Sequence, residues 1–243
     1  MSSAPILFVP GAFTGGWIWE AQFMPFFRDA GFAVQAVTFP SHQASALRRQ
    51  RLGLSSYVDH LTQIIQTMPH PPILVAHSLG GLIALQAMQR TPLTAVALLS
   101  PVPPDGLLRS AATLLRRSPI SLAKLLAVAV DARVTRFGSP PLGIYSASCD
   151  PQMAEAVTRQ LRGESLLALG QALFHRQQMT PTKVPLHFFG AEGDYVIPSS
   201  EVRRTALRYG APVTIYDGMS RTFQAEAEWH RVAGDILRWL VSR

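Results

Sequence analysis

Short apolar runs alternate with amphipathic segments over the first hundred residues of the chain. Runs such as Ile6–Val9 and Ile73–Ala76 are uninterrupted, which is typical of strands buried on both faces. The segments between them place apolar residues three and four positions apart, as helices with one buried face do. The predicted strands are residues 6–9, 32–39, 73–76 and 95–99, and the predicted helices are residues 20–30, 55–68 and 80–90.

The alternation stops near Pro103 and resumes after Thr180, with a leucine-rich, helical and loop-like stretch between them. Beyond it we predict strands at 186–189 and 213–216 and helices at 199–209 and from about 226. Alternating strands and helices predict a mostly parallel sheet flanked by helices, an α/β fold. We expect residues 1–103 and 181–243 to form its core. Residues 104–180 are expected to be a helical cap inserted over the carboxyl edge of the sheet, where ligands bind.

The composition indicates one globular protein with a large core. Of 243 residues, 48% are apolar and 15% are charged. The single cysteine, Cys149, excludes an internal disulfide and favours a reducing compartment. The opening residues lack the basic segment of a signal peptide, and the longest apolar stretch, residues 125–130, is far shorter than the roughly 18 residues of a membrane span. We therefore expect a cytoplasmic monomer or homodimer without a membrane span.

The formal charge of +7 comes from arginine, which outnumbers lysine 20 to 2. These arginines are scattered along the chain, with no block of five or six basic residues and no accompanying aromatic motif, so nucleic acid is not the expected partner. The charge instead favours an anionic small molecule as the partner. No cluster has the spacing of a metal site and no glycine loop resembles a phosphate cradle, so neither metal nor cofactor is expected.

The most specific motif lies at residues 73–85, ILVAHSLGGLIAL. A predicted strand runs into Ala76-His77-Ser78-Leu79-Gly80 and a helix follows at once, which matches the G-x-S-x-G nucleophile elbow with alanine at the first position. Small residues on either side of the serine let strand and helix approach closely. The N–H of Leu79 would lie at a helix N-terminus, where it can stabilise an oxyanion. The alternative is an ordinary turn that contains a serine.

With this elbow, the chain resembles the α/β-hydrolase superfamily along essentially its whole length. VPGAF, residues 9–13, is similar to the family's His-Gly-x loop with Pro10 in place of the histidine. The resemblance implies that the N–H of Ala12 is a second oxyanion donor, with Phe13 beside it. Trp17 stands where family members often carry aromatic residues, and FPSHQAS, which contains His42, resembles another family segment near the pocket.

The resemblance also places the other two members of a catalytic triad. GAEGDYVIP, residues 190–198, resembles the loop that carries the acid, and Asp194 is the matching residue. The third member should be a histidine just after the last strand. The register there gives Gly218-Met219-Ser220 followed by Arg221, with Glu226 and Trp229 also in the family's positions, so Arg221 is predicted to stand where the histidine should be.

This substitution removes the expected base. A guanidinium stays protonated and cannot take the serine proton, and loss of the base costs a triad about 10⁶ in rate. Either His42 or His175 could lean over Ser78 in its place, although both also fit ordinary packing or surface roles. His77 flanks the serine, in a position whose side chain normally points into the core, and His230 falls about two turns into the last helix.

Asp194 and Arg221 are expected to form an ion pair. The arginine could simply neutralise a buried carboxylate, or it could present positive charge to an anionic or enolate-like ligand. Three functions stay open: hydrolysis of a small, apolar ester, lactone or thioester with a rescued base; a non-hydrolytic step such as cyclisation, lyase or isomerase chemistry; and small-molecule binding without catalysis.

Overall fold

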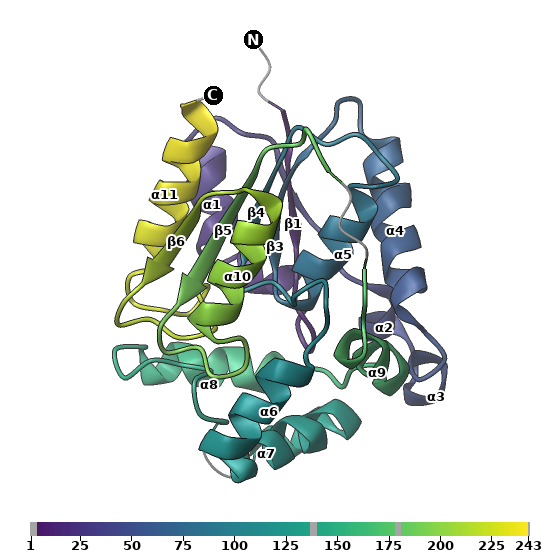
Figure 1. The fold of residues 1–243 in the computed structure, drawn as a ribbon, viewed down its shortest axis with the longest axis vertical. Helices are drawn as coiled ribbons and strands as arrows, with labels where there is room; N and C mark the ends of the chain where they lie inside the picture. Colours follow the sequence, from purple (N-terminus) through teal and green to yellow (C-terminus); the bar gives the residue numbers. More distant parts are fainter. Residues whose placement is uncertain (1–3, 137–139, 178–180, 243) are drawn as a thin grey trace.

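The computed structural model describes residues 4–136, 140–177 and 181–242. Its centre is a six-stranded sheet with the order β2-β1-β3-β4-β5-β6, in which every neighbouring pair is parallel (Figure 1). The strands are β1 (Ile6–Val9), β2 (Val34–Ala36), β3 (Ile73–His77), β4 (Ala95–Leu99), β5 (Leu186–Ala191) and β6 (Val213–Tyr216). The prediction of a mostly parallel sheet flanked by helices is confirmed.

Helices cover both faces of this sheet and one of its edges. The helices are η1 (Gly16–Trp19), α1 (Phe23–Asp29), α2 (Pro40–Gln43), α3 (Ala46–Arg49), α4 (Leu54–Thr67), α5 (Leu79–Ala87), α6 (Leu108–Arg117), α7 (Pro119–Val130), η2 (Ala132–Arg136), α8 (Pro151–Gln160), α9 (Leu166–Leu173), α10 (Ser199–Tyr209) and α11 (Trp229–Val241). Helices α4, α5 and α10 pack with one buried cluster, and α1 and α11 pack with another. The sheet thus separates two hydrophobic cores.

The central strands are apolar on both faces because each face is covered. Every residue of β1, β3 and β4 is buried, as expected for parallel strands between two helical layers. Helices α6 to α9 lie together beyond the carboxyl ends of the strands, in the lower part of Figure 1. The predicted boundary of this cap at Thr180 falls outside the described residues.

Several predicted elements have different bounds in the structure, and three of the differences matter most here. The first helix begins at Phe23, after the 3-10 turn η1, and the second strand is only Val34–Ala36. The last helix begins at Trp229 rather than near Glu226. Glu226 instead turns its buried carboxylate back onto two backbone N–H groups, those of Ser146 and Ser220. These hydrogen bonds connect the loop before α11 to the cap.

Candidate active site

Ser78 lies at the sharp turn between β3 and α5. Its backbone has φ 56° and ψ −120°, a conformation that costs a non-glycine residue about 1–3 kcal/mol. Two glycines provide the space that this turn requires. A Cβ on Gly80 would lie 2.3 Å from the Pro10 carbonyl oxygen, and one on Gly11 would lie 2.9 Å from the Ser78 Cβ. The loop after β1 therefore packs directly against the elbow.

Ala12 and Leu79 line the same cavity as Ser78. Leu79 opens α5, so its N–H has no partner within the helix. Among the described residues, neither this N–H nor that of Ala12 has an acceptor in the protein. Phe13, with φ 68°, instead donates its N–H to Glu164 Oε2 at 3.2 Å. Ala12 and Leu79 are thus the donors left free for a ligand.

Arg221 joins Ser78 to Asp194. Its Nη1 donates to Asp194 Oδ2 at 2.9 Å, and its Nη2 donates to Ser78 Oγ. Asp194 Oδ1 accepts the N–H groups of Val196 and Ile197, each at 2.9 Å. Burial raises the pKa of the Asp194 carboxyl, and the charge of Arg221 together with these N–H groups opposes that rise. All three side chains of the Ser78–Arg221–Asp194 chain are buried.

The direction of these hydrogen bonds determines what Ser78 can do. A guanidinium has donors only and stays protonated, so Arg221 cannot accept the hydroxyl proton. It occupies a lone pair of Ser78 Oγ and leaves the O–H free to donate. The Ser78 hydroxyl can therefore donate a hydrogen bond to a ligand, as can the N–H groups of Ala12 and Leu79.

A segment of the cap holds Arg221 in place. The Arg221 N–H donates to the Gly143 carbonyl at 3.1 Å, and the next N–H along the chain donates to Ile144 at 3.1 Å. Gly143 has φ 81°, and a Cβ there would lie 2.6 Å from the Tyr195 nitrogen. Only glycine fits this space, between the Arg221 loop and the loop that carries Asp194.

The histidines lie away from the Ser78 hydroxyl. Among the described residues, no histidine forms a hydrogen bond with Ser78 Oγ. His77 is buried in the cavity wall, where burial and then the charge of Arg221 lower its pKa to about 3. His77 is thus neutral near pH 7 and has little basicity. His230 is the second residue of α11, not two turns into it, and contacts Trp229 edge-on.

Three residues assigned to the pocket from the sequence lie elsewhere. Within the described part of the chain, Trp17, His42 and His175 are absent from the cavity wall. His42 Nε2 lies 3.1 Å from Glu164 Oε2 instead. Trp17 packs beside Gly15 on the α1 side of the sheet, and the backbone of His175 lies against Gly106. Phe13 and His77 do line the cavity.

Glu164 is a buried carboxylate that the sequence interpretation missed. Besides His42 and the Phe13 N–H, it accepts the Tyr57 hydroxyl at 2.5 Å and the Ser165 N–H at 2.9 Å. Burial raises its pKa, but the hydrogen bonds and the charge of His42 outweigh burial, and the pKa is lowered overall. The only sequence signal was a lone acidic residue before a leucine-rich helix. Through Phe13, Glu164 fixes the loop that carries the Ala12 N–H.

The cavity above Ser78, called the apolar chamber below, has a volume of about 360 Å³. Its polar side chains are His77, Ser78, Ser110 and Arg221. Its aliphatic wall is formed by Val102, Leu107, Leu114, Leu122, Leu125, Leu126, Ala129, Ile144, Leu166, Leu169, Leu173, Val196 and Ile197. A ligand of this chamber is therefore expected to be mostly apolar, with its polar atom at the Ser78 end.

The described residues contain no group of three or more His, Cys, Asp or Glu side chains arranged to hold a metal ion. None of their helices is long and apolar enough to cross a membrane.

Comparisons with known proteins give a consistent fold. A structure of an extracellular α/β-hydrolase from a Paenibacillus species, described as sharing homology with tobacco salicylic acid binding protein 2, has a TM-score of 0.71 at 16% identity and covers 97% of this chain and 98% of its own. Tomato methylketone synthase I, solved with 2-tridecanone, has a TM-score of 0.71 at 17% identity. The match covers 100% of this chain and 99% of the tomato protein. A methylesterase from Arabidopsis has a TM-score of 0.71 at 15% identity. The match covers 99% of this chain and 100% of the methylesterase.

The sequence itself matches a family. A search of curated proteins finds no significant match. The sequence profile described as "Alpha/beta hydrolase family" matches residues 6–234, which is nearly the entire chain. The chain belongs to the α/β hydrolase family.

Proposed function

We propose that the protein acts on a small, largely apolar carbonyl compound by a non-hydrolytic step, in which Ser78 is a hydrogen-bond donor and not a nucleophile. The observation that carries this proposal is the contact of Arg221 with both Ser78 and Asp194. In this proposal Arg221 occupies the place of a triad's base. Because it cannot accept a proton, the serine oxygen stays protonated.

The three donors at the floor of the apolar chamber suit a carbonyl oxygen. Such donors bind more strongly as negative charge develops on the oxygen, so they favour a transition state over the ground state. The aliphatic wall would hold the rest of the ligand. A reaction that moves electrons onto a carbonyl oxygen without first removing a proton from the substrate needs these donors and this wall, but no base.

Loss of CO₂ from a β-keto acid is one reaction of this kind. The electrons of the breaking C–C bond move towards the carbonyl and form an enolate, and a proton then converts the enolate to a ketone. The Ser78 hydroxyl and the two N–H groups would stabilise the enolate oxygen. Tomato methylketone synthase I, which shares this fold and was solved with 2-tridecanone, supports this choice of substrate class.

Binding without turnover is the second candidate. It is favoured by the mutual neutralisation of Arg221 and Asp194 and by the lack, among the described residues, of a base that contacts Ser78. In that case the ion pair would only stabilise a buried carboxylate.

The test uses a medium-chain β-keto acid and the methyl ketone that its decarboxylation yields. We expect faster ketone formation than in buffer, and a rate reduced about tenfold or more in Ser78→Ala, because one oxyanion donor is lost. Leu122→Trp, which fills the apolar chamber, should abolish the effect, and Leu207→Trp on the exposed side of α10 should not. Ketone binding without any turnover would support the second candidate. Absence of both would contradict the proposal.

A further inference from the structure

The outer surface of the cap is unusually apolar for an exposed surface. Of the thirteen large hydrophobic residues that are strongly exposed in the described part of the chain, ten lie between residues 104 and 180. The most exposed on α7 are Ile120 (70%), Leu126 (60%) and Val130 (64%), and α9 adds Leu166 and Leu167. Exposed apolar residues concentrated on one part of a protein indicate an interaction surface.

The apolar chamber opens onto this surface. Leu126 and Leu166 line the chamber and are also exposed to solvent, at 60% and 45%. From these two residues we infer that the mouth of the chamber lies near α7 and α9, among exposed aliphatic side chains. An apolar ligand that enters or leaves there would pass directly through whatever covers this face.

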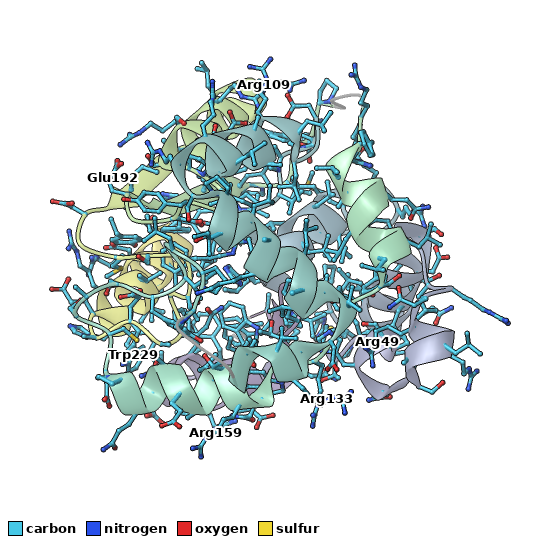
Figure 2. All side chains as sticks on the ribbon, turned by 90° about the horizontal axis from the view of Figure 1, so that it is seen from below. Arg49, Arg109, Arg133, Arg159, Glu192 and Trp229 are labelled. Atoms are coloured by element: carbon cyan, nitrogen blue, oxygen red, sulfur yellow. The ribbon has the colours of Figure 1, made fainter. Side chains whose placement is uncertain are left out.

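Arginines surround the same end of the molecule. Figure 2 views the cap end-on and shows Arg49, Arg109, Arg133 and Arg159 spread around its rim. Among the described residues, seven exposed arginines on or beside the cap have no carboxylate within ion-pair distance. These are Arg48, Arg51, Arg109, Arg116, Arg117, Arg162 and Arg176.

Arg133 and Arg159 on the cap are paired, with Asp131 and Glu155, but pairing is more frequent among the arginines of the core. Arg90, Arg203, Arg204, Arg208, Arg231 and Arg238 each have an acidic partner within 3.4 Å. Arg28 on α1 is the exception, because it has no such partner among the described residues. Uncompensated positive charge is thus gathered around the apolar cap, while most of the charge on the core is neutralised locally.

We propose that this cap face docks on the surface of an anionic lipid bilayer. Helices that combine exposed aliphatic residues with a basic rim lie in the bilayer interface, with the apolar residues below the headgroups and the arginines beside the phosphates. The long arginine side chains can reach the headgroups while their stems stay apolar. The chamber mouth would then face the lipid, and an apolar ligand would reach Ser78 without crossing water.

The experiment is co-sedimentation of the whole protein with vesicles. We expect binding to an equal mixture of phosphatidylcholine and phosphatidylglycerol, and little binding to phosphatidylcholine alone. Ile120→Glu should weaken binding about tenfold or more, and Arg116→Gln about fivefold at low salt. Leu207→Glu and Arg203→Gln, on α10, are matched controls that should leave binding unchanged.

Three results would overturn the proposal. The first is no binding to the anionic vesicles, and the second is binding that Ile120→Glu leaves intact. The third is a homodimer, measured by light scattering, that Ile120→Glu converts to a monomer, since this face would then cover a second copy. Vesicle binding does not involve Ser78 or Arg221, so its outcome is separate from that of the proposed chemistry.

Discussion

The two junctions that meet at Ser78 differ in what they offer a ligand. The β3–α5 junction provides donors that no described group of the protein uses, the N–H of Leu79 and the Ser78 hydroxyl. The Arg221 loop, between β6 and α11, provides a guanidinium whose contacts are already made to Asp194 and Ser78. In the proposed function, the first junction would stabilise negative charge on a ligand, whereas the second cannot accept a proton. Under that proposal, an oxyanion site would be kept without a base.

Arg221→His should produce the largest change, because it places a base beside both Ser78 and Asp194. We expect turnover of an activated medium-chain ester to rise about 10⁴-fold, measured by release of a chromophoric leaving group. Arg221→Lys supplies a cation in the same place and should show no such rise. The gain should vanish in the double variant Arg221→His/Ser78→Ala. A gain that survives without Ser78 would mean that the ester is cleaved elsewhere.

Asp194→Asn should destabilise the fold strongly, because it leaves the Arg221 charge buried without its partner. We expect a loss of about 3–5 kcal/mol in the free energy of unfolding, measured by urea denaturation. Asp59→Asn is the matched control, since Asp59 is 57% exposed in its pair with Arg90 and should contribute less than about 1 kcal/mol. Equal losses in the two variants would contradict a buried charge pair.

His77→Phe tests the β3–α5 junction through the pH dependence of the free energy of unfolding. The folded pKa of His77, about 3, lies below the ordinary value of 6.5. Above pH 6.5 the group is neutral in both states and has no effect. Below it, the unfolded chain takes up a proton that the folded protein does not, so stability falls by about 1.4 kcal/mol per pH unit towards pH 3. In His77→Phe, the free energy of unfolding measured by urea denaturation should therefore fall less steeply between pH 6 and pH 4 than in the unaltered protein. The same pH dependence in both proteins would contradict a lowered pKa for His77.

Gly143→Ala should have the smallest of these effects, acting on the cap segment behind Arg221. Its Cβ would lie 2.6 Å from the backbone nitrogen of Tyr195. We therefore expect the free energy of unfolding, measured by thermal denaturation, to fall by about 1–3 kcal/mol. Gly210→Ala is the control: it also has a positive φ, but nothing lies within 4 Å of its Cβ. It should cost only about 1 kcal/mol. A smaller loss for Gly143 than for Gly210 would show that the contact is not tight.

The parts of the fold set by local pattern were predicted well from the sequence. The bounds of β1, β4, α10 and β6 agree with the predictions, because each is a short apolar run or an amphipathic segment between clear turn signals. The short helices α2 and α3 were missed, since the segment FPSHQAS and the four residues after it are too short to show helical periodicity. The Ser78 turn could be anticipated from its motif, because close packing there requires small neighbours.

The rest of the site depends on contacts between distant segments. Nothing near Phe13 in the sequence indicates that Glu164 will take its N–H, and nothing near Arg221 indicates that Gly143 will accept from it. The same is true of His42, which was considered as a substitute base and lies against Glu164 instead. These partners are brought together only when the cap folds over the sheet edge.

The most direct test of the account is labelling of the unaltered protein with an activated fluorophosphonate, followed by mass spectrometry of the peptide that contains Ser78. We expect labelling no faster than that of Ser78→Ala, and rapid labelling of Arg221→His under the same conditions. Rapid modification of Ser78 in the unaltered protein would show that a base does reach the serine and would contradict its proposed role as a hydrogen-bond donor.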